Sequence, residues 1–235
     1  HFFGQSSFAT YTVAHERSVV KVRRDVPLEL LGPLGCGVQT GAGAVMNTLK
    51  VGPGQSFAAF GAGAVGLSAV MAARACGATT IIAVDPKDNR LALARELGAT
   101  HTVNPTEGDP VEAVRAVTGG LGVNFTLESS GLSAVLRQAV DALDVLGVCG
   151  VVGAPAMGTV AEFDWNGLMV PGKAIRGIIE GDSVPEVFIP QLIDLYAQGR
   201  FPFDRLVKFY SPEQINEAAA DSERGETLKP IIRFG

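Results

Sequence analysis

Cysteine is scarce in this sequence, and its scarcity narrows the class of protein. The 235 residues contain three cysteines, Cys36, Cys76 and Cys149, which are widely spaced and odd in number. Small secreted domains that depend on disulfides carry paired cysteines at high density. The count therefore argues against a disulfide framework and favours a reducing compartment, so we predict a cytoplasmic protein.

Basic clusters and long apolar runs are also missing. The net charge is −5 and no block of lysine and arginine occurs, so we expect no nucleic acid as a partner. Glycine, arginine or aspartate breaks every apolar stretch well before the about 18 residues that a membrane-spanning helix needs. No basic segment followed by an apolar one opens the chain, so neither a secretion signal nor a membrane partner is predicted.

Apolar residues are plentiful, although no long apolar run occurs. They make up 47% of the sequence, which allows a sizeable core in one large or two small domains. The first residue is His1 rather than methionine, and the opening segment is typical of the middle of a protein. We expect the chain to be the C-terminal part of something longer.

A glycine-rich turn dominates the sequence pattern. An apolar run at Phe57–Phe60 leads into Gly61-Ala62-Gly63-Ala64-Val65-Gly66, and an alanine-rich helical pattern follows. Gly61 permits a tight turn, Gly63 lets the backbone approach a pyrophosphate, and Gly66 lets the helix lie close to its strand. The N–H groups at the start of that helix suit a phosphate pair. The alternative is a strand–helix turn that is glycine-rich by chance.

Asp85 indicates which dinucleotide the turn binds. It ends the next apolar run, Ile81–Val84, about 20 residues after Gly66, where a strand end lies beside the adenosine ribose. A carboxylate there accepts hydrogen bonds from the ribose hydroxyls and repels a 2′-phosphate, and Pro86 adds no positive charge. NAD is therefore predicted rather than NADP. Asp85 as an ordinary strand-end residue is the competing interpretation.

Strand and helix patterns alternate along the rest of the chain. Apolar runs predict six strands, and the patterns between them predict crossover helices, with Ser183 as the cap of a helix that follows the sixth strand. The expected segments of this α/β fold are strands at 57–60, 81–84, 101–103, 123–127, 148–152 and 174–179. We predict a Rossmann doubly wound parallel six-stranded sheet. Its last strand, Ala174–Ile179, should be an exposed apolar edge that joins two copies of the chain, so a homodimer or homotetramer is expected.

Segments at both ends fit no strand of this sheet. Phe8–Val13 and Val19–Val22 are typical of strands, Pro27–Leu31 begins a helical turn, and the last residues predict a strand, a helix and a final strand. They indicate remnants of a second, β-rich domain.

These motifs together resemble the zinc-dependent medium-chain alcohol dehydrogenases over essentially the whole chain. The markers are His1–Gly4, Leu34–Gly37 with Thr40–Gly41, Phe60–Gly66, Val84–Asp85, Glu96–Thr100 and Leu228–Ile232. Within that family, Phe2–Phe8 and Gly177–Gly181 are most similar to aryl- or benzyl-alcohol dehydrogenases, with geraniol-type enzymes as near neighbours.

The resemblance implies a GroES-like catalytic domain into which the nucleotide-binding domain is inserted. Residues 1–34 would be a remnant of the catalytic domain with a connecting segment, 35–180 the NAD-binding domain, and 181–235 a C-terminal helix and the return to the catalytic domain. The implied function is hydride transfer between a primary aryl or allylic alcohol, or its aldehyde, and NAD. Ile178 and Ile179 are expected to form either an apolar pocket wall or sheet interior.

Several site residues follow from the resemblance alone. Cys36 would be one of three protein ligands of a catalytic zinc, which would stabilise the alkoxide. Positions on the nicotinamide side match Thr40, Val65, Val152 and Gly153, while Arg90 matches a position near the adenosine ribose and Lys229 one near the pyrophosphate. In the simpler interpretation Thr40 caps a turn, the valines are core, and the two cations are surface charges.

The sequence pattern offers no second zinc ligand beside Cys36. Cys36 stands alone, because His1, His15 and His101 fit no ligand spacing and Cys76 and Cys149 lie in core patterns. We therefore expect this chain alone to bind NAD but no catalytic zinc, and to lack dehydrogenase activity. The alternatives are a zinc-free medium-chain reductase, against which Cys36 argues, and a non-catalytic NAD-binding module.

Overall fold

The computed structural model describes residues 8–234 and divides them into two compact units. The larger unit spans Cys36–Ser183, and the terminal unit joins the residues up to Gly35 with those from Val184 onward. The two terminal segments thus belong to one unit, and their assignment to a catalytic domain stays a prediction. The sequence markers within residues 1–7, His1 among them, lie outside the described residues.

A parallel six-stranded sheet forms the centre of the larger unit. Its order is β3-β2-β1-β4-β5-β6, so the progress of the chain across the sheet reverses between β1 and β4. The strands are β1 Ser56–Phe60, β2 Thr80–Val84, β3 His101–Val103, β4 Val123–Glu128, β5 Leu143–Val151 and β6 Ala174–Gly177. Every neighbouring pair is parallel, which confirms the predicted doubly wound sheet.

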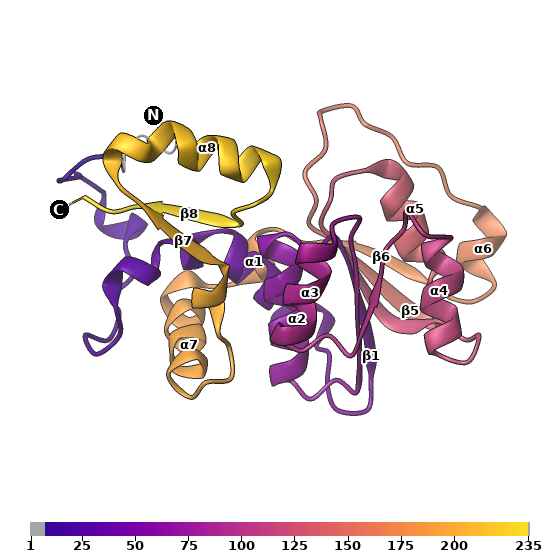
Figure 1. Ribbon diagram of the computed structural model, residues 1–235. Coiled ribbons are helices and arrows are strands. Elements are labelled where there is room, and N and C mark those ends of the chain that lie inside the picture. The colour runs from indigo at the N-terminus through magenta and orange to yellow at the C-terminus, as the bar shows by residue number, and fades with distance from the viewer. Residues whose placement is uncertain (1–7, 235) are drawn as a thin grey trace. The chain divides into compact units, whose positions relative to one another are not determined.

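Helices cover both faces of this sheet. α2 and α3 lie on one side, and α4 and α5 lie on the other (Figure 1). The helices are α2 Ala64–Ala75, α3 Asp88–Leu97, α4 Pro110–Val117, α5 Ser133–Asp141 and α6 Trp165–Met169. Their ends follow local chemistry, since the Asp109 side chain accepts N–H bonds at the start of α4 and Gly98, with φ 126°, ends α3.

The core lies between the sheet and these helices. Phe57, Phe60, Ile82 and Leu127 are fully buried in it. Cys149 is buried there as well, and burial raises the pKa of its thiol to about 12, which keeps it an unreactive core residue as predicted. No helix within residues 8–234 has the length and apolar character needed to cross a bilayer.

A glycine-rich helix precedes the first strand. α1 covers Gly37–Gly43 and continues as a π-helical segment, Ala44–Leu49. A Cβ atom on Gly41 would overlap the Val65 carbonyl oxygen, and one on Gly43 would lie 2.5 Å from the Gly181 carbonyl oxygen. Close tertiary contact therefore compensates for the poor helix propensity of glycine.

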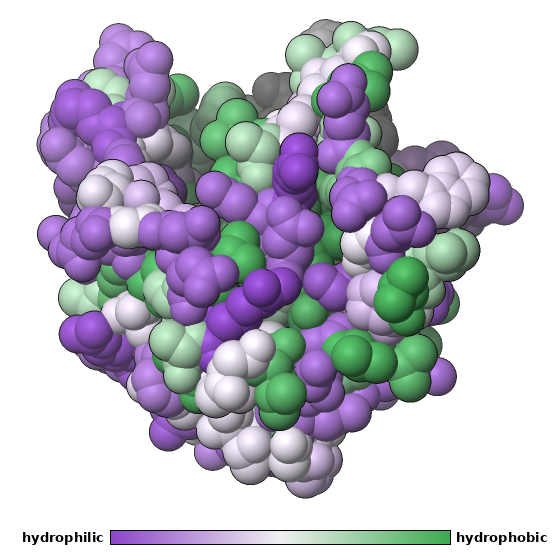
Figure 2. All heavy atoms as spheres, turned by 90° about the vertical axis from the view of Figure 1, so that its right-hand side faces the viewer, coloured by the Kyte–Doolittle hydropathy of each residue, from purple (hydrophilic) through white to green (hydrophobic). Residues whose placement is uncertain are grey.

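β6 is the edge strand that the sequence predicts. Among residues 8–234 it pairs with β5 alone, and all four of its residues are exposed, Ile175 among them. Seen from the right-hand side of Figure 1, apolar side chains gather in patches between polar ones (Figure 2). An exposed edge of this kind can pair with another strand.

The terminal unit combines segments from both ends of the chain. It contains α7 Pro185–Ala197, β7 Val207–Tyr210, α8 Ile215–Arg224 and β8 Lys229–Ile232, and β7 pairs with β8 in parallel. Ion pairs tie the early residues to the late ones, with Arg23 bonded to Asp194 at 2.7 Å and Arg233 to Glu29 at 2.9 Å.

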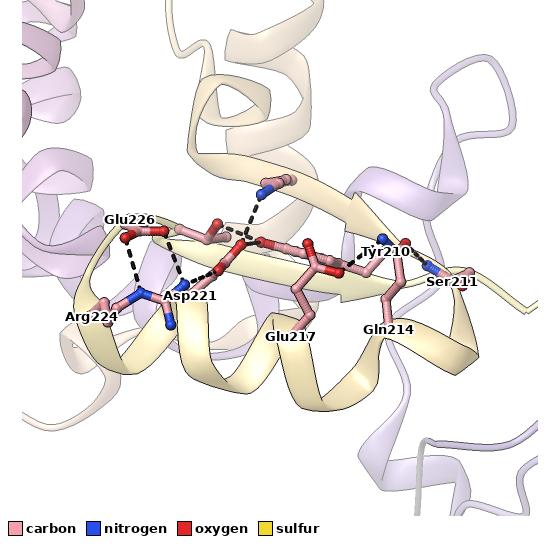
Figure 3. Close-up of polar contacts among 9 residues, drawn as sticks. Tyr210, Ser211, Gln214, Glu217, Asp221, Arg224 and Glu226 are labelled. Atoms are coloured by element: carbon pink, nitrogen blue, oxygen red, sulfur yellow. Dashed lines mark hydrogen bonds and ion pairs between the residues drawn. The ribbon is translucent and has the colours of Figure 1, made fainter.

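A buried carboxylate joins α8 to β7 (Figure 3). Asp221 is 5% exposed and accepts hydrogen bonds from the Tyr210 hydroxyl at 2.6 Å and the Lys208 ammonium at 2.8 Å. Arg224 donates to its second oxygen at 2.6 Å. The carboxylate is thus fully paired, which a buried charge requires.

Three local predictions are wrong. Phe8–Val13 and Val19–Val22 are not strands, because no segment of the described chain pairs with them, and an extended segment without a partner forms no sheet. Ser183 does not cap α7. Its hydroxyl donates instead to the Glu180 carbonyl oxygen at 2.5 Å, and Val184 occupies the cap position.

Candidate functional site

The chain leaves β1 through a tight glycine turn. Gly61 adopts φ 102°, a left-handed conformation that glycine reaches without strain. A Cβ atom on Gly66 would overlap the Gly61 carbonyl oxygen, so only glycine lets α2 begin this close to the turn. Both residues therefore have the structural roles that the spacing of the motif predicts.

The start of α2 is open for a ligand. Gly63, Ala64 and Val65 are half-buried, and no side chain caps the helix. No atom lies within 4 Å of the position that a Cβ atom on Gly63 would take. The N–H groups of the first turn and the positive end of the helix dipole thus face free space, which suits a phosphate pair.

Asp85 follows β2 and closes the turn from the other side. Its carboxylate accepts a hydrogen bond from the Ala62 N–H at 2.8 Å and another from the Lys87 N–H at 2.9 Å. The side chain is almost fully buried, and its nearest cation is Arg90, whose guanidinium lies 3.5 Å from the carboxylate. The carboxylate therefore shapes the glycine turn as well as facing the cleft beside it, a role that spacing alone does not indicate.

A cleft of about 580 Å³ lies at the carboxyl ends of β1, β2 and β4, where the strand order reverses. Its walls include Gly61, Gly63, Asp85, Arg90 and Ser130. A doubly wound sheet binds its ligand at this switch point. The structure therefore brings the glycine turn, the predicted ribose carboxylate and Arg90 around one cavity.

Glu128, which holds the loop that carries Ser130 into the cleft wall, is a residue that the sequence motifs did not indicate. It ends β4, is 1% exposed, and its Oε1 accepts hydrogen bonds from the N–H groups of Ser130 at 2.6 Å and Gly131 at 2.8 Å. Ser129 donates to the Phe60 carbonyl oxygen at 3.1 Å, which joins this loop to β1. Glu128 could have been found from the sequence as an acidic residue at the end of a predicted parallel strand next to the switch point.

Val152 and Gly153 follow β5 and contact the same loop. Their N–H groups donate to the Glu128 carbonyl oxygen at 3.0 and 3.1 Å. A Cβ atom on Gly153 would overlap the Gly131 nitrogen, so this glycine is required by packing. Gly153 and Glu128 also line a small pocket of about 70 Å³ beside the cleft.

Cys36 and Thr40 meet at the start of α1. Cys36 is exposed, and its thiol lies 3.9 Å from a carboxylate oxygen of Glu180. Thr40 is buried and its hydroxyl lies 3.0 Å from the Cys36 carbonyl oxygen and 3.2 Å from the other Glu180 oxygen. The two predicted catalytic residues thus both contact Glu180, a residue to which the sequence pattern assigned no role.

The remaining candidates lie elsewhere. Lys229 belongs to the terminal unit, at the start of β8, and its predicted contact with the pyrophosphate stays a prediction. The ring of His15 accepts the Arg17 N–H, and the ring of His101 lies 2.9 Å from the Thr100 hydroxyl. Within residues 8–234 no three histidine, cysteine or acidic side chains are grouped to hold a metal ion.

Comparison with known proteins identifies the family. The sequence profile of the zinc-binding dehydrogenases matches residues 64–198, which is more than half of the chain. The chain belongs to the zinc-binding dehydrogenase family. The match begins at the first residue of α2 and includes Asp85, Arg90 and Ser130, so it covers much of the lining of the cleft described above. The resemblance stated from the sequence motifs is confirmed.

Individual members of the zinc-binding dehydrogenase family match nearly the whole chain. The solved structure of an alcohol dehydrogenase zinc-binding domain protein from Burkholderia ambifaria is 66% identical and covers 99% of the chain, with a TM-score of 0.96. Benzyl alcohol dehydrogenase from Acinetobacter calcoaceticus is 58% identical, also over 99% and with a TM-score of 0.96. Geraniol dehydrogenase from Castellaniella defragrans is 49% identical over 99% of the chain.

The chain spans only part of these relatives. It covers 63% and 64% of the two solved structures and 62% of the geraniol dehydrogenase.

Proposed function

We propose that this chain is the NAD-binding part of a zinc-dependent alcohol dehydrogenase, which transfers hydride between a primary aryl or allylic alcohol and NAD. The observation that carries the proposal is the cleft in which the open start of α2 faces Asp85. The substrate class rests on the similarity to a benzyl alcohol and a geraniol dehydrogenase. A cytoplasmic location and a homodimer or homotetramer belong to the same proposal.

Each cleft residue has a defined task in this proposal. The N–H groups of Gly63, Ala64 and Val65 bind the pyrophosphate, while the free lone pairs of Asp85 accept the ribose hydroxyls and Arg90 flanks the ribose. Thr40, Val65, Val152 and Gly153 form the nicotinamide side. Lys229 approaches the pyrophosphate.

Zinc is proposed for the whole enzyme rather than for this chain alone. The thiol of Cys36 has the right chemistry for a zinc ligand, but the described residues hold no group of three donors. When bound, zinc supplies Lewis acidity at the alcohol oxygen, and the bound NAD accepts the hydride. We expect metal analysis of the purified chain to find less than one tightly held zinc per subunit.

Calorimetry with NAD tests the proposal. The chain should bind one NAD per subunit, with weaker binding of NADP because Asp85 repels a 2′-phosphate. A thermal shift measured with each dinucleotide gives an independent check. Absence of both heat and thermal shift with NAD would rule out the proposed function.

A further inference from the structure

α5 and the residue before it supply one wall of the cleft, and this wall is apolar except at one position. Its residues on the cleft are Leu132, Ala134, Val135 and Gln138. Positions 134 and 135 lie four and three residues before Gln138, so the helical repeat places these side chains on one face. Gln138 is therefore the polar side chain in an apolar stripe.

The other polar side chains of the cleft already have partners in the protein. The Ser129 hydroxyl donates to a carbonyl oxygen of β1, and the Ser130 hydroxyl donates to a carboxylate at the end of β4. Asp85 and Arg90 form an ion pair at 3.5 Å. Within residues 8–234, no hydrogen bond or ion pair involves the side chain of Gln138. A few polar groups on an apolar wall orient a ligand and give a pocket its specificity, and the Gln138 amide is available for this task.

The position of Asp85 indicates which part of the ligand this wall meets. In the proposed function the adenosine ribose binds Asp85, and the base lies next to it because a single bond joins the two rings. The Asp85 N–H donates to the Val103 carbonyl oxygen at 3.2 Å, so the end of β3 lies beside Asp85. Pro86 and Pro105, which follow these two strand ends, both line the cleft. Their apolar rings and the apolar wall of α5 suit the faces of a purine.

The amide of glutamine matches one edge of adenine. It carries a hydrogen-bond donor and an acceptor side by side. Adenine presents its N6 amino donor next to the N7 acceptor, and a glutamine amide pairs with both at once. We propose that Gln138 recognises the adenine base of the dinucleotide through these two hydrogen bonds. The inference rests on the proposed function, because it takes the ligand of the cleft to be NAD.

Such a contact discriminates between bases. Hypoxanthine has a carbonyl oxygen where adenine has the amino group, so this edge presents two acceptors to the amide. One of them faces the amide oxygen and stays unpaired, which lowers the affinity. Gln138 thus makes the cleft selective for an adenine dinucleotide over one that carries hypoxanthine.

Calorimetry with NAD and with nicotinamide hypoxanthine dinucleotide tests the inference. The purified 235-residue chain should bind NAD about tenfold more tightly than the hypoxanthine analogue. Gln138→Met keeps the length of the side chain and its suitability for a helix, but removes both hydrogen-bonding groups. This variant should bind NAD about tenfold more weakly than the wild type and should bind the two dinucleotides within about twofold of each other. Thermal unfolding confirms that the variant is folded.

Gln198→Met is the matched control, because it makes the same substitution at an exposed glutamine of the terminal unit. It should leave the preference for NAD unchanged. A preserved preference in Gln138→Met, or a lost preference in Gln198→Met, would overturn the inference. Equal binding of both dinucleotides by the wild type would overturn the inference alone, whereas binding of neither would overturn the proposed function together with it.

Discussion

Gly63 and Gly66 stand three residues apart in the same turn, yet the structure gives them different tasks. A Cβ atom on Gly66 meets the Gly61 backbone, whereas a Cβ atom on Gly63 meets nothing. One glycine is therefore needed for folding and the other for ligand access. The motif alone does not separate these two requirements.

Alanine substitutions distinguish the two roles. Gly66→Ala should lower the free energy of unfolding by about 3 kcal/mol or more, because backbone atoms cannot move away from the new methyl group. Gly63→Ala should change stability little, since its φ of −75° suits alanine, but should weaken NAD binding about tenfold or more. Urea unfolding and NAD titration of both variants provide the measurement. Equal effects of the two substitutions would contradict the assignment.

Asp85 serves both the ligand and the turn. Asp85→Asn should weaken NAD binding about tenfold or more, because hydrogen bonds to a charged acceptor are lost, and should narrow the preference for NAD over NADP. The comparison with Asp88→Asn, an exposed carboxylate three residues later, controls for net charge. The measurement is the dissociation constant of each variant for NAD and for NADP. If the ratio of these two constants is the same in Asp85→Asn as in the wild type, Asp85 does not contact the ribose.

At the scale of elements, the Asp221 network ties α8 to β7. Hydrogen bonds from Lys208 and Tyr210 lower the pKa of the Asp221 carboxyl below its ordinary value. A lowered folded-state pKa adds stability that is fully present above the ordinary pKa of about 4 and is lost as the pH falls through the lower value. Acidification should therefore weaken the packing of α8 on β7.

Asp221→Asn should remove this pH-dependent contribution to the stability of the fold. We expect its melting temperature to fall by a few degrees at pH 7, where the carboxylate is charged, and by less at pH 3. Glu223→Gln, which changes an exposed carboxylate on the same helix, should have little effect at either pH. Thermal scans at the two pH values measure these melting temperatures. A larger fall in the melting temperature of Asp221→Asn at pH 3 than at pH 7 would contradict a stabilising role of the charged carboxylate.

At the scale of the whole molecule, the exposed β6 edge predicts self-association. Ile175 on this strand is 38% exposed, and the strand has no second neighbour within the described chain. We expect light scattering at micromolar concentration to give a dimer or tetramer, and Ile175→Asp to shift the population toward monomer. Val184→Asp is the control, because Val184 is an exposed apolar residue outside β6, and it should leave the oligomeric state unchanged. A monomeric wild type would refute the prediction.

Much of the larger unit was predictable because its signals are local. Short apolar runs, the glycine turn and helix ends such as Gly98 each depend on neighbouring residues, and the six strands follow from them. The two early strand predictions failed for the complementary reason. A strand exists only through hydrogen bonds to a partner, and alternation in Phe8–Val13 carries no information about whether a partner is present.

By itself the sequence determined the doubly wound sheet, the glycine turn and the placement of an acidic residue at the end of the second strand, since periodicity and spacing encode these along the chain. Only the tertiary structure decided that Asp85 binds the turn itself, that Glu128 supports the cleft, and that Glu180 meets Cys36. The last two residues are 144 positions apart. Contacts at such separations arise from how whole elements pack, which no local pattern records.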